Sequence, residues 1–281
     1  MPSITIDSFD DPRIDPYRSL KSEVPLRRQK FFIAEGEKLA RRLLASDYEV
    51  ESLLVSHKIA HDFDSESTRI PIYVIPDGWV EGIVGYNFHR GVLACGRRKT
   101  LPTVDQICAR IGEYATLVVC PDVQDPENLG SIFRLASAFG VDAVLLGNHT
   151  ADPLSRRVLR VSMGAVLRMP YVLTTDIAAA VRHLGGQGFA RWATVLDREA
   201  EPLTEMFVPP KLALLFGSEG HGLDRSLVDL CDRRVTIPIS GEVDSLNVSI
   251  AAGIFLNHVA HLGNPKRSSR PCADAKSATK S

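Results

Sequence analysis

Three short stretches decide the fold class of this chain: NLGSIFR at residues 128–134, FGSEGHGL at 216–223 and IPISGEVDSLNVSIAAG at 237–253. Each stretch lies at the point where a predicted strand gives way to a loop or a helix. The carboxyl ends of strands in an open α/β sheet are the usual place for a ligand. The three stretches are therefore candidates for one binding site that is assembled from separate loops.

Apolar runs of strand length alternate with helical patterns over the same part of the chain. The runs show little polar alternation, which is typical of parallel strands that are covered on both faces. Strand followed by helix, repeated in this way, favours an α/β layered sheet. The predicted strands are 116–120, 143–147, 190–196, 212–217 and 234–239, and the predicted helices lie near 128–140, 154–165, 176–185, 222–231 and 245–262.

The first 99 residues predict a smaller α/β unit. Residues 31–46 have the spacing of an amphipathic helix, and 50–56, 70–76 and 91–96 are expected to be strands. Residues 100–112 are the expected linker and short helix, 113–264 the larger α/β domain, and 265–281 a disordered tail rich in Ser, Ala, Lys and Pro.

Composition sets the class of protein. The 281 residues are 44% hydrophobic and 24% charged, as in a soluble globular protein, and the net charge of −1 is not that of a strongly basic nucleic-acid binder. Five scattered cysteines without a CxxC pair indicate a reducing compartment and neither a disulfide framework nor a zinc site. No apolar run approaches a membrane span, and the polar N-terminus lacks a secretory signal, so the sequence predicts a cytoplasmic protein.

In the first stretch, Asn128 stands where a helix N-cap is expected. An apolar stripe follows, and Gly130, Arg134 and Ser137 share another face of the predicted helix. Because helical side chains lean toward the N-terminus, Arg134 would lie over Gly130, beside a gap that a substrate group could fill. Alone, the pattern is also that of an ordinary capped helix with a solvated arginine.

The second and third stretches have specific features as well as ordinary readings. Three glycines in six residues allow the loop that begins at Gly217 to approach a ligand closely. The order is not that of a dinucleotide fingerprint, a P-loop or a nucleophile elbow. A tight turn would explain the glycines but not Glu219. In the third stretch, Ser245 or Asp244 is expected to open a tightly packed helix, which leaves Asn247 unexplained.

Other polar residues give weaker signals. His57 and His61, and likewise His258 and His261, are expected on the surface and not as metal ligands, so we predict no metal site. The run Arg27, Arg28 and Lys30 could contact phosphates or be solvated, and nearby basic residues favour phosphates. The candidate phosphate-binding residues are Arg18, Lys21, Arg27, Arg28 and Lys30.

Taken together and in this order, the three stretches resemble the signature motifs of the SpoU (TrmH-like) RNA 2′-O-ribose methyltransferases of the SPOUT superfamily. The resemblance covers roughly residues 115–262. It implies a parallel α/β sheet whose C-terminal segment forms a trefoil knot, S-adenosylmethionine as the cofactor, and a homodimer with the active site at its interface. The preceding 100 residues look like the small L30-type domain that binds tRNA or rRNA substrates in this family.

The resemblance also implies residue roles. Gly217, Ile237 and Leu246 would hold the cofactor, and Arg134 would lie beside the 2′-OH. The remaining predicted catalytic residues, which would position the ribose and order Arg134, are Asn128, Glu219, Ser245 and Asn247. A guanidinium rarely gives up its proton, so Arg134 is expected to grip a phosphate and stabilise the developing alkoxide. No cysteine stands where a methyl carrier would be needed, which favours direct transfer.

Two other classes of protein remain as alternatives. An RNA-binding protein that kept this fold and lost activity would show the same pattern of strands, but the signature residues are all present. A nicotinamide-dependent dehydrogenase is disfavoured by the missing fingerprint.

Overall fold

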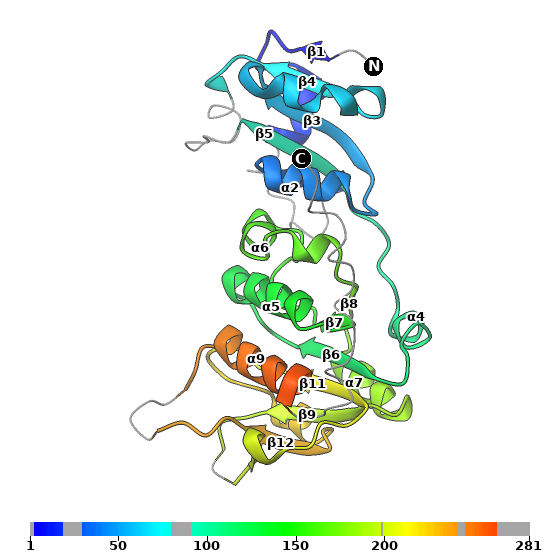
Figure 1. Ribbon diagram of the computed structural model, residues 1–281, viewed down its shortest axis with the longest axis vertical. Coiled ribbons are helices and arrows are strands. Elements are labelled where there is room, and N and C mark those ends of the chain that lie inside the picture. The colour runs from blue at the N-terminus through cyan, green and yellow to red at the C-terminus, as the bar shows by residue number, and fades with distance from the viewer. Residues whose placement is uncertain (1–2, 19–29, 80–90, 198, 241–244, 263–281) are drawn as a thin grey trace. The chain divides into compact units, whose positions relative to one another are not determined.

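The computed structural model describes residues 3–18, 30–79, 91–197, 199–240 and 245–262 (Figure 1). Contacts divide the chain into two compact units. The first comprises Met1–Thr100 and Asp152–Arg168, and the second comprises Leu101–Ala151 and Met169–Ser281. The segment Asp152–Arg168 thus belongs to the first unit, although it lies within the predicted 113–264 span of the sequence.

A five-stranded mixed sheet forms the centre of the first unit. Its order is β1-β4-β3-β5-β2, in which β1, β4 and β3 run parallel while β5 is antiparallel to both of its neighbours. The strands are β1 (Ile4–Thr5), β2 (Phe31–Glu35), β3 (Val50–Ser56), β4 (Ile72–Ile75) and β5 (Val92–Arg97). The strands predicted at 50–56, 70–76 and 91–96 are therefore confirmed.

The single helix predicted over 31–46 is wrong in its first third. Phe31–Glu35 is strand β2, which pairs antiparallel with β5, and the helix α2 is confined to Glu37–Leu44. Gly36 lies between them with φ of 91°, a left-handed conformation that glycine adopts without a Cβ clash. A buried strand and a buried helical face have similar apolar residues, so the sequence pattern ran across the break.

Short helices cover this sheet. They are η1 (Pro12–Ile14), α1 (Asp15–Arg18), α2, the 3-10 segment η4 (His57–Thr68), α6 (Arg156–Val161) and η5 (Ala165–Leu167). Tyr17 of α1 is fully buried, and its hydroxyl lies 2.7 Å from the Ser52 hydroxyl. Two ion pairs hold the segment that contains α6: Arg156 with Glu35 at 2.8 Å, and Arg98 with Asp152 at 3.0 Å.

The second unit contains a seven-stranded sheet, and every strand pairing in it is parallel. The order is β10-β12-β9-β11-β6-β7-β8. The strands are β6 (Ala115–Cys120), β7 (Ala143–Leu146), β8 (Tyr171–Leu173), β9 (Ala190–Thr194), β10 (Glu201–Pro202), β11 (Lys211–Leu215) and β12 (Arg233–Thr236). The predicted α/β class with a parallel sheet is confirmed, while the short strands β8 and β10 were not predicted.

Helices lie on both faces of this sheet (Figure 1). On one face, α4 (Val104–Cys108) and α7 (Ile177–Gly186) bury a cluster in which Leu184 meets Val119 and Leu215. On the other face, α5 (Pro126–Ala138) and α9 (Val248–Asn257) lie side by side. The unit also contains η6 (Leu203–Glu205), α8 (Arg225–Val228) and the π-helix η7 (His258–Leu262). Among the described residues, we find no helix with the length and apolar character that crossing a membrane requires.

Gly147, directly after β7, is a position where any side chain would collide with backbone. An added Cβ would lie 2.0 Å from the Pro121 carbonyl oxygen. The Gly147 N–H also donates to the Cys120 carbonyl at 3.0 Å, which joins the ends of β6 and β7. We expect Gly147→Ala to lower the free energy of unfolding by more than about 2 kcal/mol, because neither backbone segment can shift cheaply.

Urea unfolding monitored by circular dichroism measures this change. Gly186→Ala is the matched control, because nothing lies within 4 Å of an added Cβ at that position in α7. The control should hold or raise stability, since alanine is the better helix former. Equal stability of the two variants would contradict the proposed clash.

Candidate active site

A cavity of about 630 Å³ opens at the carboxyl ends of three neighbouring parallel strands, β12, β9 and β11. Residues that directly follow each strand line it, together with the first residues of α9 and Phe255. This arrangement follows from the topology, because parallel strands end at the same edge of the sheet. Gly217, Ile237 and Leu246, the predicted cofactor residues, all line the cavity, as do Glu219, Ser245 and Asn247.

The loop after β11 is closed by its own backbone. Ser218 and Gly222 exchange two N–H···O hydrogen bonds of 3.0 Å each, and Gly222 has φ of 67°. An added Cβ on Gly217 would lie 2.1 Å from the carbonyl carbon of Gly222. Gly217 is therefore required for the loop itself to close, whatever ligand the cavity takes.

Asn128 lies inside its helix and not at the helix start. The N-cap of α5 is Asp125, whose carboxylate accepts from the Glu127 N–H at 3.0 Å, and the predicted capping role of Asn128 is wrong. Asn128 is only 7% exposed. Its amide has partners from the two other stretches: the Nδ2 group donates to Glu219, and Oδ1 accepts from Asn247 Nδ2 at 2.9 Å.

Asn247 determines the direction of this hydrogen-bond chain. It is the N-cap of α9, and its Oδ1 accepts from the Ser249 N–H at 2.8 Å and from the Ser249 hydroxyl at 2.7 Å. The prediction that Ser245 or Asp244 opens this helix is therefore wrong. With its oxygen occupied by donors, Asn247 presents only N–H groups to Asn128, which in turn must donate to the Glu219 carboxylate.

The chain Asn247–Asn128–Glu219 holds three separate loops in one arrangement beside the cavity. Each link pairs a donor with an acceptor, and the last is a charge-assisted bond to a carboxylate. Glu219 remains exposed at the cavity, so its carboxylate is available to a ligand. The site can therefore orient a polar ligand beside a cavity that has both polar and apolar lining residues.

Arg134 and Ser245 are not part of this hydrogen-bond chain. Arg134 is exposed on α5, and none of the residues that the structure describes forms a hydrogen bond or an ion pair with it. It follows Asn128 by six residues, which places it roughly 120° further around the helix. Ser245 lines the cavity without a hydrogen bond to another described residue. The predicted ordering of Arg134 by the other site residues is not seen within this single chain.

The predicted RNA-binding residues lie in the first unit or outside the described residues. Arg18 donates to the Asp11 carbonyl at 2.7 Å and lies 3.4 Å from Asp15. Lys30 lies over the Phe31 ring at 5.2 Å. Lys21, Arg27 and Arg28 fall outside the described residues. The RNA-binding assignment therefore stays a prediction.

No reactive thiol lies near the cavity among the described residues. Cys120, at the end of β6, is fully buried, and desolvation with the nearby Glu219 charge raises its pKa to about 12. A thiol of this kind stays protonated and does not act as a nucleophile. In the described part of the chain, His, Cys, Asp and Glu side chains form no group that could hold a metal ion.

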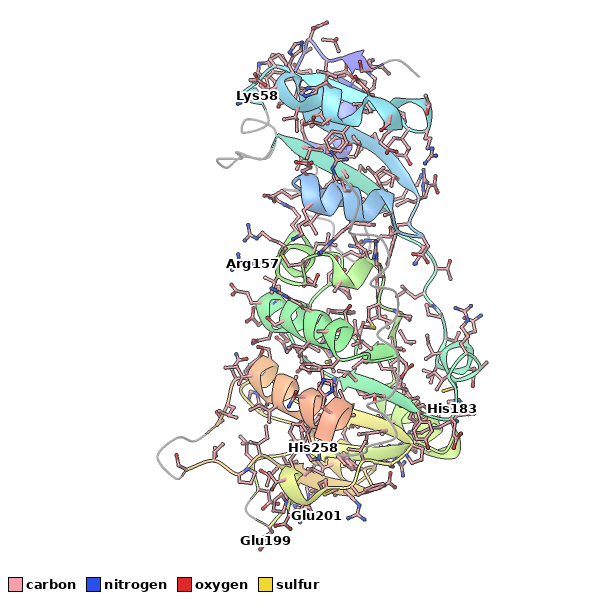
Figure 2. All side chains as sticks on the ribbon, viewed as in Figure 1. Lys58, Arg157, His183, Glu199, Glu201 and His258 are labelled. Carbon is pink, nitrogen blue, oxygen red and sulfur yellow. The ribbon has the colours of Figure 1, made fainter. Side chains whose placement is uncertain are left out.

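His258 does not lie on the surface as predicted. It is 8% exposed at the start of η7, and its Nε2 lies 3.1 Å from the Met206 carbonyl oxygen (Figure 2). Two features of the cavity were not predicted: its wall at 194–196, and the packed pair Phe216–Phe255, whose ring centroids are 5.8 Å apart. The end of an apolar run at 190–196 was the available signal for the wall.

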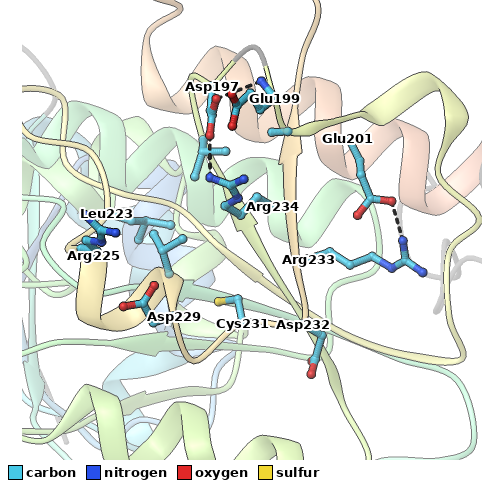
Figure 3. A pocket seen from close by; sticks show the side chains of 13 residues that line it. Asp197, Glu199, Glu201, Leu223, Arg225, Asp229, Cys231, Asp232, Arg233 and Arg234 are labelled. Atoms are coloured by element: carbon cyan, nitrogen blue, oxygen red, sulfur yellow. Dashed lines mark hydrogen bonds and ion pairs between the residues drawn. The ribbon is translucent and has the colours of Figure 1, made fainter.

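A second cavity, of about 790 Å³, adjoins the first and shares Val195 and Leu223 with it (Figure 3). Its charges are largely neutralised: Arg234 pairs with Asp197 at 2.7 Å, and Arg233 pairs with Glu201. It contains no residue of the hydrogen-bond chain. The smaller cavity, which brings the three stretches together, is therefore the candidate active site.

The fold and the site define a parallel α/β protein with a ligand cavity built from strand-end loops. Comparison of its sequence with known proteins shows the family to which it belongs. The model of the SpoU rRNA Methylase family matches residues 115–257, which include all three stretches. A Mycobacterium bovis protein described as an uncharacterized tRNA/rRNA methyltransferase is 36% identical over 255 residues, covering 87% of each chain. The chain therefore belongs to the SpoU rRNA Methylase family of RNA methyltransferases, and the resemblance read from the three stretches is confirmed.

Two further relatives extend the comparison. The 23S rRNA (guanosine(2553)-2′-O)-methyltransferase RlmP of Bacillus subtilis is 29% identical and covers 90% of this chain and 98% of its own. The solved structure of an AdoMet-bound rRNA methyltransferase from Sinorhizobium meliloti superposes with a TM-score of 0.79 at 25% identity, covering 91% of this chain and 96% of that one.

The two roles of Asn247 can be separated by substitution. Asn247→Asp keeps an N-cap acceptor but loses the N–H groups that donate to Asn128, whereas Asn247→Ala loses both. We expect the alanine variant to be less stable by about 1–2 kcal/mol for the cap alone. The aspartate variant should also be destabilised. An aspartate at position 247 has no N–H group to donate, so the buried Oδ1 of Asn128 would lose its hydrogen bond while its Nδ2 group still donates to Glu219.

Urea unfolding of both variants, beside Asp176→Ala, tests this expectation. Asp176 caps α7 by accepting from the Ala179 N–H at 2.8 Å and has no part in the site. It therefore reports the loss of a cap alone. Full stability of Asn247→Asp would show that the bond to Asn128 contributes nothing.

Proposed function

We propose that the protein transfers a methyl group from S-adenosylmethionine to a ribose 2′-OH of structured RNA, with ribosomal RNA as the favoured substrate class over tRNA. The observation that carries this proposal is the hydrogen-bond chain Asn247–Asn128–Glu219 at the edge of the strand-end cavity. The activities for which the Bacillus subtilis relative and a Ralstonia nicotianae 23S rRNA (guanosine-2′-O-)-methyltransferase, 34% identical over 178 residues, are named support the choice of the ribose oxygen and of rRNA.

The cavity fits the proposed cofactor. Its volume of about 630 Å³ lies within the range of small-molecule sites. Leu196, Ile237 and Ile239 supply an apolar wall for a flat base, and the loops around Gly217 and Leu246 supply backbone polar groups. When bound, S-adenosylmethionine supplies a methyl group activated by the positive charge on its sulfur.

The site residues of the protein would position the RNA and stabilise the charge that develops during the reaction. Asn128 and Asn247 hold Glu219 in place, and Glu219 and Ser245 orient the ribose at the cavity. The positively charged guanidinium of Arg134 grips the adjacent RNA phosphate and stabilises the negative charge that develops on the 2′ oxygen as the hydroxyl proton leaves to water. Buried Cys120 cannot carry the methyl group, which supports direct transfer.

Arg134 is proposed to complete the site of a second copy of the chain. Its direction on α5, away from the hydrogen-bond chain of its own copy, supports action across an interface. The neighbouring helix α9 exposes Ile250 by 56% and Ile254 by 40%, an apolar surface that a homodimer would bury.

Two features of the resemblance remain part of the proposal. The C-terminal segment would thread a trefoil knot, which is supported by the internal position of β12 between β10 and β9 and by the packing of α9 on α5. The first unit would be an L30-type RNA-binding domain, for which its separate mixed sheet is the support.

We expect Arg134→Ala to lower methyl transfer by at least a hundredfold, since loss of one charge-stabilising group costs about 3 kcal/mol in the barrier. Affinity for S-adenosylmethionine should stay within a few-fold, because Arg134 does not line the cavity. Transfer from labelled cofactor to rRNA, followed by nuclease digestion and mass analysis of the nucleosides, gives both rate and product. The control is Arg182→Ala, because Arg182 is also an exposed arginine but lies on α7.

Outcomes of that experiment separate the alternatives. A 2′-O-methylated nucleoside made by the wild type and lost in Arg134→Ala supports the proposal. Cofactor binding without any transfer to RNA would favour an inactive RNA-binding protein. Equal rates for Arg134→Ala and the wild type would exclude Arg134 from the chemistry.

Sedimentation at micromolar concentration should give about twice 30.8 kDa for the wild type. Ile250→Glu combined with Ile254→Glu should produce monomers, because burying unpaired carboxylates at an interface is costly. Phe207→Glu, at an apolar side chain that is 70% exposed and does not belong to α9, is the control. An active wild-type monomer would contradict the shared site.

A further inference from the structure

The first unit contains a cavity of about 370 Å³, and no residue of the three stretches lines it. It lies where the β2–α2 turn meets the α6 segment. Its lining residues are Glu35, Gly36, Glu37, Lys38, Leu39, Arg160 and Met163, all of them in the first unit.

The charges at this cavity leave a positive excess. Glu35 pairs with Arg156 at 2.8 Å, and Glu37 pairs with Arg41 at 2.9 Å, so both carboxylates are already neutralised by arginines outside the lining. Lys38 and Arg160 are exposed, and within the described part of the chain neither makes a hydrogen bond or an ion pair. Two cations from two different elements therefore face one cavity.

Arg160 also lies within electrostatic reach of Arg156. Burial lowers the pKa of Arg156, and the charge of Arg160 lowers it further, against the opposing effect of Glu35. Glu35 already balances the charge of Arg156, so the charge of Arg160 adds to the positive potential at the cavity.

The backbone on the α2 side adds donors to these side chains. α2 begins at Glu37, and its N-cap residue Gly36 has no side chain that could cap the helix. The N–H groups of Leu39 and Ala40 donate to the Gly36 carbonyl, while those of Glu37 and Lys38 have no backbone acceptor among the described residues. Free N–H groups in the first turn of a helix favour an anion. Leu39 and Met163 supply the apolar part of the lining.

We propose that this cavity binds a phosphate group of the RNA backbone, held by Lys38 and Arg160. The inference rests on the proposed function, because it takes RNA as the substrate. Two cationic side chains together with backbone N–H donors suit a phosphodiester, whose oxygens accept several hydrogen bonds at once. The apolar lining suits the adjoining ribose. Such a contact positions the RNA and reads no sequence.

Binding of a fluorescein-labelled RNA hairpin to the full chain, followed by anisotropy over a series of KCl concentrations, tests the site. Lys38→Gln combined with Arg160→Gln should weaken binding roughly three- to tenfold and flatten the log–log salt dependence by about 0.7–0.9, the loss of one phosphate contact. Lys58→Gln combined with Arg69→Gln removes two exposed cations elsewhere on the first unit and controls for net charge (Figure 2).

Two further measurements complete the test. Lys38→Arg combined with Arg160→Lys keeps the charges and should keep the wild-type slope, which shows that charge and not folding is responsible. Affinity for S-adenosylmethionine, measured by calorimetry on the same preparations, should be unchanged in all variants. If the wild type binds RNA but transfers no methyl group, the proposed function fails while the salt slopes still decide this site. Equal slopes and affinities for the glutamine pair and its control would overturn the phosphate site.

Discussion

The buried amide of Asn128 is the constraint on which the site depends. A desolvated amide without partners costs about 1–3 kcal/mol, so both ends of this side chain need hydrogen bonds. Its two partners lie 91 and 119 residues further along the chain. The hydrogen bonds of the Asn128 amide therefore fix the loop after β11 and the start of α9 relative to α5. The shape of the cavity depends on these fixed positions.

The same constraint explains a division between cavity and chemistry. Parallel strands end at one edge, which supplies a cofactor-sized cavity largely from backbone and apolar side chains. The polar groups stand at its border, held by Asn128. Arg134, the basic residue of the first stretch, lies on another face of α5, away from these polar groups.

The sequence predicted the parallel sheet well because its strands are continuous apolar runs, as in TLVVC and LALLF. It failed where two elements with similar apolar content adjoin, as at Gly36, and at very short strands such as β10. The predicted starts of α5 and α9 were wrong because several polar residues near each start could cap the helix, and tertiary packing decides which of them does. The N-caps in the structure are Asp125 for α5 and Asn247 for α9. The bond from Asn128 to Asn247 could not be derived from spacing, since it exists only once the sheet is assembled.

The membership of Asp152–Arg168 in the first unit limits how the chain can be divided. The connection between β7 and β8 of the parallel sheet passes through the other unit, so the chain crosses from one unit to the other three times. A proteolytic cut after Thr100 would detach Met1–Thr100 from the rest of the chain, while Asp152–Arg168, the last part of the first unit, would stay covalently joined to the second unit. The first unit therefore cannot be removed intact by cutting the chain once, because part of it lies within the sequence of the second unit.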